Sequence, residues 1–435
     1  MNKITITMKN LNKSLLLIGL FCMSFIGYGQ GETEFVPRLY TPATPACVYH
    51  ENDYEGTSRI LRSQNVLNRS GAPCSTFIVN YTGFTPEAQA AFQFAVDIWA
   101  MSIESNQTIR INASFDALAP GVLGQAGPTG FLTSNHPDAV PNVFYPRALW
   151  EKIEDTDSSP FGGSIDISSQ FSSTFNFYFG TDANPPGGQI DFVSVVLHEI
   201  GHGLGFTGFA FTDGTTGQVR DTGTMLPSVY DITIENGSAQ SLLDTAIFTD
   251  PSTALHAQIT GGDLFNNGTI TTVQNGGVKP KIFAPNPYQG GSSYSHWDTN
   301  TFPISNVNTL MTPSIGPGVA VHDPGPITLG MFEDMGWSIC GGSLLSTQNY
   351  SLDTVEVSPN PFTSSLTIKL PIASNDNYNL NLFDINGRIV LSESREATNG
   401  TITISNLDQL EDALYFVKIT NEKSGASFTK KVIKN

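Results

Sequence analysis

The chain carries the stretch His198-Glu199-Ile200-Gly201-His202, in which two histidines four residues apart enclose a glutamate. In a helix, His198 and His202 lie on one face and one turn apart, so both imidazoles can reach the same metal ion. Glu199 then projects beside them, where it can hold a water at an open position of the metal. The spacing therefore predicts a helix that presents a metal site.

The residues on both sides of this stretch favour a buried helix over a chance match with two surface histidines. Residues 191–197 are mostly apolar and lead into the motif. Gly203 and Gly205 follow it and predict that the helix ends there in a sharp turn. The pattern H-E-x-x-H on a helix is typical of zinc-dependent proteases, in which the glutamate is the general base.

A catalytic zinc site takes three protein ligands and a water, so two histidines leave the predicted site incomplete. The compact form of the motif places a third histidine at the position that Gly208 occupies here. The third ligand must therefore come from further along the chain. The downstream candidates are three histidines and three rival carboxylates: His256, His296, His322, Asp213, Asp221 and Glu235. We expect His256 and His322 to be structural or exposed.

His296 is the preferred candidate because of the motifs around it. It stands in S-H-W-D at residues 295–298, before L-M-T-P at 310–313 and M-F-E-D-M-G-W at 331–337. Together with H-E-I-G-H-G-L-G-F at residues 198–206, these motifs resemble the leishmanolysin-like metzincin family of metalloproteases. That family has an insertion before a distant third histidine, and the polar residues 207–295 match it here.

The resemblance, which covers roughly residues 76–338, implies a zinc site and an activity. It makes His198, His202 and His296 ligands of Zn2+, Glu199 the general base, and Met311 a packing residue in a Met-turn beneath the metal. The implied function is a secreted zinc metalloendopeptidase that hydrolyses a protein or peptide substrate by Glu-assisted attack of a zinc-bound water. The alternative is a non-catalytic extracellular binding or adhesion protein on the same scaffold.

The first 30 residues are predicted to be a secretory signal peptide. Three lysines precede a short apolar run at residues 15–26, and small residues follow. The run is short for a membrane span, which needs about 20 apolar residues, and no later stretch is long enough. We therefore expect the mature chain to lack a transmembrane segment and to be secreted or held at the cell surface. Residues 31–75 are predicted to be a pro-segment or an N-terminal extension.

The composition narrows the class of partner. The formal net charge of −18 argues against a nucleic-acid partner, because an acidic surface repels phosphate. Charged residues make up only 14% of the chain, and Gly, Ser, Thr and Asn are abundant. This composition favours an exported protein that is rich in loops and strands.

Three cysteines remain after removal of the signal peptide: Cys47, Cys74 and Cys340. An odd number allows one disulfide and one free thiol. Cys47 with Cys74 is the preferred pair because the two are near in sequence. The alternative use of Cys47 is as a thiolate that occupies the open position of the metal and keeps a protease latent.

Residues 76–340 are predicted to form an α+β, metzincin-like catalytic domain with a mixed twisted sheet, an active-site helix and a Met-turn. Thr85 and Pro86 predict the start of an amphipathic helix. Strands are expected at residues 76–81, 109–115, 164–168, 174–179, 229–234 and 270–273, a loop at 118–130, and a short strand or turn at 143–150. One of the strands at 164–168 and 174–179 is expected to form an edge beside the site, where an extended peptide can bind by strand addition.

A polar linker is expected at residues 341–352, and residues 353–435 are predicted to form a separate all-β domain. Short alternating segments predict strands at residues 355–357, 366–370, 380–383, 388–391, 401–404 and 414–419. Asn386-Gly387 predicts a hairpin turn. The pattern favours a small sandwich of immunoglobulin-like type.

Four stretches of this region carry a second resemblance. They are S-P-N-P-F at 358–362, L-F-D-I-N-G-R at 382–388, L-Y-F-V-K-I at 414–419 and K-K-V-I-K at 430–434. They resemble the type A C-terminal sorting domain of the type IX secretion system. The resemblance implies export across the outer membrane of a Gram-negative bacterium, with the type IX secretion machinery as partner. The alternative is an appended adhesive or carbohydrate-binding sandwich.

Overall fold

The computed structural model describes residues 35–42, 47–52, 56–61, 72–344, 355–370, 377–421 and 427–435. The predicted signal peptide and most of the predicted linker lie outside the described residues. Within the described part of the chain, no helix is long and apolar enough to cross a membrane.

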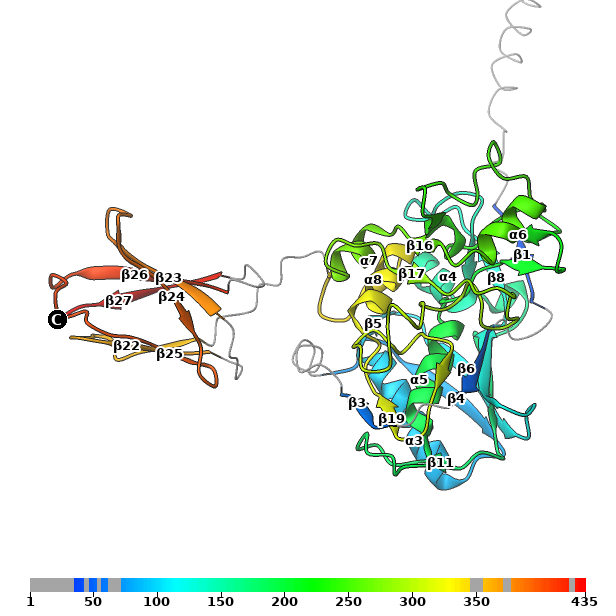
Figure 1. Ribbon diagram of the computed structural model, residues 1–435, viewed down its shortest axis with the longest axis horizontal. Coiled ribbons are helices and arrows are strands. Elements are labelled where there is room, and N and C mark those ends of the chain that lie inside the picture. The colour runs from blue at the N-terminus through cyan, green and yellow to red at the C-terminus, as the bar shows by residue number, and fades with distance from the viewer. Residues whose placement is uncertain are drawn as a thin grey trace, which may run out of the picture. The chain divides into compact units, whose positions relative to one another are not determined.

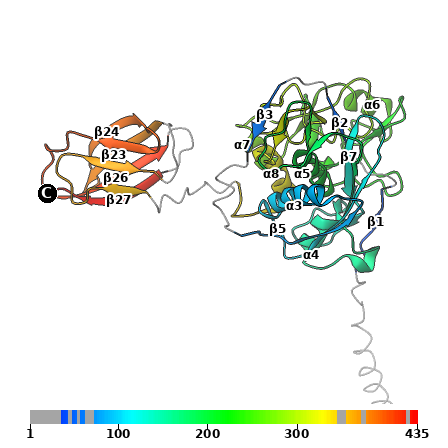
Figure 2. The same ribbon diagram turned by 90° about the horizontal axis from the view of Figure 1, so that it is seen from below.

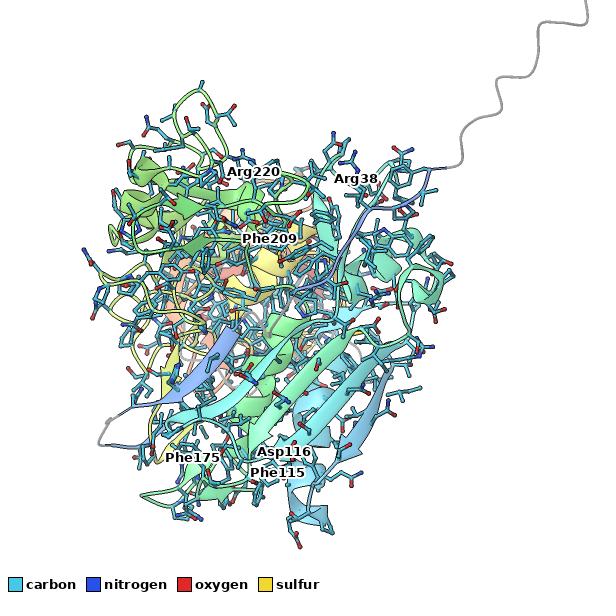
Figure 3. All side chains as sticks on the ribbon, turned by 90° about the vertical axis from the view of Figure 1, so that its right-hand side faces the viewer. Arg38, Phe115, Asp116, Phe175, Phe209 and Arg220 are labelled. Carbon is cyan, nitrogen blue, oxygen red and sulfur yellow. A yellow bond between two sulfur atoms is a disulfide. The ribbon has the colours of Figure 1, made fainter. Side chains whose placement is uncertain are left out.

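A six-stranded mixed sheet forms one layer of the larger domain, and Figure 3 looks onto it. Its order is β18 (Ser314–Ile315), β2 (Cys47–Glu51), β7 (Val122–Pro128), β10 (Ile167–Ser172), β6 (Ile109–Asp116) and β4 (Phe77–Thr82). Strands β4, β6 and β10 are parallel, and β7 runs antiparallel to β10. The chain is therefore α+β in this region, as predicted.

Two long helices pack together and support the sheet (Figure 2). The first, α3 (Pro86–Ala100), begins at the N-cap Thr85 as predicted and buries one apolar face. The second, α5 (Phe192–Gly203), contacts β2, β7 and β10. The indole N–H of Trp99 in α3 donates to the carbonyl oxygen of Leu197 in α5 at 2.9 Å, which fixes the two helices against each other.

Shorter elements surround this centre (Figure 1). The remaining helices are α4 (Arg147–Glu154), α6 (Thr253–Ile259), α7 (Thr269–Gln274) and α8 (Pro326–Met335), with 3-10 turns at Ser159–Phe161 and Asp231–Thr233. Small sheets join β1 (Leu39–Tyr40), β8 (Phe131–Thr133) and β9 (Phe144–Pro146), and also β15 (Ile234–Asn236), β16 (Leu264–Asn266) and β17 (Lys281–Ile282). Paired strands are β3 (Ser58–Ile60) with β19 (Val319–Val321), β5 (Ile103–Glu104) with β20 (Ser338–Ile339), β11 (Phe177–Tyr178) with β12 (Ile190–Asp191), and β13 (Phe211–Thr212) with β14 (Gly217–Gln218).

The loop predicted at residues 118–130 is wrong, because the segment contains β7. The glycines of this segment suggested a loop. One of them, Gly124, instead lies within the strand, where the absence of a side chain lets the strand approach α5 closely. A Cβ on Gly124 would lie 3.0 Å from the ring of Phe171 and 3.2 Å from Cγ of Glu199. The glycine therefore allows close packing within a strand.

Two strands predicted in the insertion are also wrong. Residues 270–273 lie in the helix α7, where the backbone N–H groups of Ile270 and Thr271 donate to the Asp334 carboxylate at 2.9 and 2.8 Å. This distant acceptor stabilises the first helical turn despite the β-branched residues in it. Of residues 229–234, only Ile234 is in a strand. The segment 143–150 contains both a short strand, β9, and the start of α4.

The predicted Cys47–Cys74 disulfide is wrong, because Cys74 is bonded to Cys340, 266 positions away. The two cysteines meet at the end of α3. The amide of Cys74 donates to Ala100 O at 2.8 Å, and the amide of Cys340 donates to Ser102 O at 3.0 Å. Nearness in sequence could not reveal this pair. The two cysteines are brought together only where β20, at the end of the domain, pairs with β5.

Loss of this disulfide is expected to lower the stability of the larger domain substantially. The double variant Cys74→Ser/Cys340→Ser should lower the free energy of unfolding by about 2–4 kcal/mol, because a long loop of the unfolded chain is no longer closed. Urea unfolding with and without reductant measures the effect. Reductant should bring the wild type to the stability of the variant and leave the variant unchanged. Equal stability of the oxidised wild type and the variant would contradict the assignment.

The C-terminal residues form two antiparallel sheets, drawn in orange and red in Figure 1. One sheet is β21 (Glu356–Ser358), β22 (Leu366–Lys369) and β25 (Thr401–Ile404), and the other is β24 (Ile389–Glu396), β23 (Asn377–Asp384), β26 (Leu414–Asn421) and β27 (Ser427–Ile433). They enclose a hydrophobic core of their own. The Asn386-Gly387 hairpin is confirmed, with Gly387 at φ +77°. Strand β27 was not predicted, because lysines interrupt its apolar pattern.

Candidate metal centre

The helix α5 is fixed at its start by a buried carboxylate. Asp191 Oδ2 accepts from the backbone N–H and the hydroxyl of Ser194 at 2.8 and 2.6 Å, which caps the helix. His322 Nε2 forms a further hydrogen bond to the same oxygen at 2.8 Å. His322 is therefore a buried structural histidine, as predicted. Every residue of α5 is buried, so the helix belongs to the core of the domain.

The end of α5 orients the second histidine. Gly205 has φ +125°, so the chain turns sharply after the helix, as its two glycines predicted. The turn brings the carbonyl oxygen of Phe206 within 2.7 Å of His202 Nδ1. The sharp turn is therefore what sets the orientation of the His202 imidazole.

His296 reaches the site from the far end of the insertion. The amide of Trp297 donates to Met311 O at 2.8 Å, and its buried ring packs against Phe206 at a centroid distance of 5.0 Å. His296 Nδ1 lies 2.6 Å from the carbonyl oxygen of Ser292. These contacts bring His296 next to the two histidines of α5.

The segment at residues 310–311 holds the first histidine. His198 Nδ1 lies 2.7 Å from the carbonyl oxygen of Leu310. The next residue, Met311, is fully buried, and its Sδ would lie 2.9 Å from a Cβ added to Gly201 of α5. Met311 therefore packs directly on α5 beside the histidines and supplies no ligand atom to the group.

The Nε2 atoms of the three histidines converge on one point. They are 2.9 Å apart between His202 and His198, 3.1 Å between His202 and His296, and 3.2 Å between His296 and His198. Each Nδ1 faces a backbone carbonyl, which only accepts, so each Nδ1 carries the proton. Each Nε2 is then a bare lone pair, and three lone pairs at this distance repel one another unless a cation lies between them.

This geometry fits zinc. A tetrahedral ion with Zn–N bonds of about 2.0–2.1 Å separates its nitrogen ligands by about 3.3 Å, close to the distances observed. Burial lowers the pKa of all three imidazoles, that of His202 to about 4, so the rings are in the neutral form that binds metal. Within the described residues, these three histidines are the one group of three or more potential metal ligands.

Glu199 lies beside this group in an unusual state. Its side chain is fully buried, and neither carboxylate oxygen has a hydrogen-bond partner of good geometry among the described residues. Burial raises the pKa of the carboxyl group well above its usual value, and the nearby backbone amides of Tyr49 and Ala126 offset this only in part. A buried acid whose oxygens lack well-aligned hydrogen-bond partners among the described residues, next to a potential metal site, is a candidate for proton transfer.

The rival ligands are all engaged elsewhere. Asp213 is exposed and accepts from the amides of the turn that follows it, and Asp221 caps a turn through Thr224. Glu235 pairs with Lys279. His256 Nδ1 lies 2.7 Å from the hydroxyl of Thr212. The structure therefore brings none of these rivals into the histidine group.

Cys47 is buried and free, and it is not a member of the histidine group. Its Sγ lies 3.6 Å from Thr207 Oγ1, and burial raises the pKa of the thiol to about 12. Because Sγ is not among the converging ligand atoms, the structure does not place Cys47 at the position that a latency thiolate would occupy. The residue that reaches the site from this strand is Tyr49, whose ring stacks on His198 at a centroid distance of 3.6 Å. The sequence offered one indication that Tyr49 belongs to the site: it stands two residues after Cys47, so in a strand the two side chains lie on the same face.

Two parts of the chain match family models. Residues 356–435 match the secretion system C-terminal sorting domain, and residues 91–216 match a family described as SPBPB7E8-like. No curated protein matches the sequence.

Three solved structures are similar over short parts of the chain. PorZ, a surface component of the type IX secretion system of Porphyromonas gingivalis, is 18% identical over 23% of this chain and 15% of its own (TM-score 0.17). A DUF3244 family protein from Bacteroides vulgatus with an immunoglobulin-like β-sandwich is 19% identical over 19% of this chain and 83% of its own (TM-score 0.16). Latent PorU from P. gingivalis is 23% identical over 18% of this chain and 9% of its own (TM-score 0.16).

The family match covers the whole described sandwich, from β21 to the last residue of the chain. It also includes the four stretches that carried the sequence resemblance to a sorting domain. Residues 356–435 are therefore a C-terminal sorting domain of type IX secretion, and the protein is exported to the cell surface or the extracellular space.

Proposed function

We propose that the protein is a secreted zinc-dependent endopeptidase. The observation that carries this proposal is the convergence of three Nε2 lone pairs next to the unpaired carboxylate of Glu199. Such a group combines a site for a Lewis acid with a general base, which is the pair that peptide hydrolysis needs.

The residues divide the chemistry between them. A zinc ion bound by the histidines would lower the pKa of a water to about 7 and polarise the scissile carbonyl. Glu199 accepts a proton from the attacking water and delivers it to the leaving amine nitrogen as the C–N bond breaks. The carbonyl oxygens of Leu310, Phe206 and Ser292 hold each imidazole in the tautomer that keeps Nε2 free.

We also propose that the catalytic domain is metzincin-like, of the leishmanolysin type. Support comes from the buried helix α5, from the turn at residues 310–313 that packs on it, and from α8, whose Ile327 N–H donates to Asn308 Oδ1 at 3.1 Å next to that turn. The antiparallel strand β7 lies directly over Glu199, as shown by the contact that a Cβ on Gly124 would make. This arrangement places a strand beside the site along which a peptide can bind.

One observation favours the alternative, a non-catalytic extracellular binding protein. The three histidines and Glu199 are all fully buried, so a substrate has no direct access to them in this conformation. A binding protein on the same scaffold would show no hydrolysis in any form, with or without metal.

Chelation separates the two functions. We expect 1,10-phenanthroline to abolish protein cleavage, and one equivalent of Zn2+ to restore it, because the histidines are the proposed metal ligands. Cleavage of casein is measured before and after limited proteolysis of the enzyme, since the site is buried. Cleavage that is insensitive to the chelator would contradict the zinc mechanism, and no cleavage in either form would favour the binding protein.

Deletion of residues 356–435 is expected to prevent release of the protein, because the sorting domain is the part that the type IX machinery would recognise. Cell fractionation of a producing strain should find the shortened chain inside the cell envelope and the full chain at the surface or in the medium. As a control, fusing residues 356–435 to a reporter with a signal peptide should cause its export. Full export of the shortened chain would contradict this role.

A further inference from the structure

Gly208 stands where the compact motif has its third histidine, and two side chains of the insertion fill the space beside it. A Cβ added to Gly208 would overlap the ring of Tyr294 and would lie 2.5 Å from Asp231 Oδ1. Tyr294 and Asp231 are both fully buried. A histidine side chain therefore has no room at position 208, because the insertion occupies its place.

Asp231 joins segments that are distant in sequence. Its Oδ1 accepts from the amide of Phe209 at 3.1 Å, and its Oδ2 accepts from the amide and the hydroxyl of Ser228 at 2.8 and 2.7 Å. The buried hydroxyl of Tyr294 lies next to the same carboxyl group, without a hydrogen bond of good geometry among the described residues. Asp231 therefore connects the segment that follows α5 with the segment that leads to the third histidine.

Tyr294 has a left-handed backbone, with φ +75°. This conformation is rare for a bulky residue and persists only where the surrounding structure enforces it. Here the hydroxyl of Tyr230 donates to Tyr294 O at 2.6 Å, and the amide of Tyr294 donates to Phe283 O at 2.7 Å. The left-handed residue lies between Ser292 and His296, so the bend lets His296 Nδ1 reach the carbonyl oxygen of Ser292.

The residue after Tyr294 ties the same segment to the end of α5. The amide of Gly208 donates to Ser295 Oγ at 3.1 Å. Gly208 follows the last turn of α5, which carries His202, and Ser295 directly precedes His296. The Nε2 atoms of these two histidines are 3.1 Å apart. The connection therefore fixes the second and third histidines relative to each other.

We propose that Asp231 and Tyr294 are positioning residues for the third metal ligand. Asp231 holds Tyr294 over Gly208, and the bend at Tyr294 directs His296 Nε2 toward the two histidines of α5. Neither residue supplies a ligand atom. The proposal rests on the proposed function and deepens it, because it gives the insertion the task of completing the metal site.

The position of His296 is tested by nuclear magnetic resonance on the full-length, metal-free chain labelled with 15N-histidine. A buried Nδ1–H that is bonded to a carbonyl exchanges slowly with water, so we expect separate signals from His198, His202 and His296. The His296→Ala variant identifies the third signal. Asp231→Asn offers one acceptor oxygen instead of two, so one of its donors loses a partner. This variant should lose the His296 signal and keep the other two, whereas general destabilisation would weaken all three.

Zinc affinity is measured on the same preparations by competition with a chromophoric chelator. Asp231→Asn should weaken zinc binding by about tenfold or more, as expected when the group that orients a ligand is lost. The matched control is Asp250→Asn, which alters a buried carboxylate of the insertion that pairs with Arg220 and lies outside the histidine group. The control should lower the melting temperature without changing the zinc affinity.

A second variant leaves Asp231 intact. In Gly208→Ala, the new Cβ displaces the ring of Tyr294, and zinc affinity should again fall by about tenfold or more. The matched control is Gly290→Ala, because a Cβ added there would meet no atom within 4 Å. This control should keep both the His296 signal and the zinc affinity of the wild type.

The positioning role and the proposed function fail separately. Loss of the His296 signal and of zinc affinity in Asp231→Asn and Gly208→Ala, but not in the controls, supports the positioning role. The same losses in a protein whose zinc-loaded wild type hydrolyses no peptide support the positioning role and contradict the endopeptidase. A His296 signal and a zinc affinity that persist in both variants overturn the positioning role, whatever the hydrolysis shows.

Discussion

Replacing Glu199 with Gln is expected to lower peptide hydrolysis by about 10²–10⁴-fold while leaving the amount of bound zinc unchanged. The amide has nearly the same shape, but it cannot accept the proton of the attacking water. Zinc should stay bound because its proposed ligands are the three histidines. Turnover and metal content are measured on the same preparation, before and after limited proteolysis of the chain.

The stability of this variant provides a second check. Neither oxygen of the buried Glu199 carboxyl group has a hydrogen-bond partner of good geometry among the described residues, so its replacement by a neutral amide should not lower the melting temperature. The matched control is Glu235→Gln, which alters a carboxylate that pairs with Lys279 and lies outside the histidine group. The control should retain full turnover. Native turnover in Glu199→Gln would assign the base to another residue.

Replacing His296 with Ala is expected to lower zinc affinity by about a hundredfold or more, and hydrolysis with it. The variant removes one of three converging Nε2 atoms and leaves His198 and His202 facing each other at 2.9 Å. Metal content by mass spectrometry and turnover should fall together, and excess zinc should restore turnover at most in part. Loss of both bound zinc and turnover identifies a metal ligand. Loss of turnover alone, as expected for Glu199→Gln, identifies the general base.

His136→Ala is the control for this prediction. His136 is partly exposed, lies beside Asp138 and is not a member of the histidine group. The control should bind one zinc and turn over normally. Unchanged zinc affinity in His296→Ala would show that the third ligand is another group.

The sequence predicted the helix of the site because its signals are local. The four-residue spacing of the histidines, the apolar run before them and the glycines after them all act within one helix and its end. Local spacing could not supply the third histidine. The resemblance carried by the motifs around residues 296, 311 and 331–337 led to it, and the structure brings His296 to within 3.2 Å of the others.

The errors arose where distant contacts overrode local pattern. The glycines of β7 suggested a loop, but Gly124 is required by the closeness of Glu199 and Phe171. The β-branched start of α7 suggested a strand, but Asp334 stabilises it as a helix. The Cys74–Cys340 bond and the stacking of Tyr49 on His198 join segments that are far apart in sequence. No local signal predicts such contacts.

The most direct test of the zinc mechanism is a zinc titration of the metal-free chain, before and after limited proteolysis, with peptide products measured by mass spectrometry at each addition. Hydrolysis is expected to rise linearly to one equivalent of zinc per chain and then stay constant, and Glu199→Gln is expected to bind the same equivalent without forming products. Products from the metal-free chain, or a full equivalent of bound zinc without hydrolysis by the wild type, would contradict this mechanism.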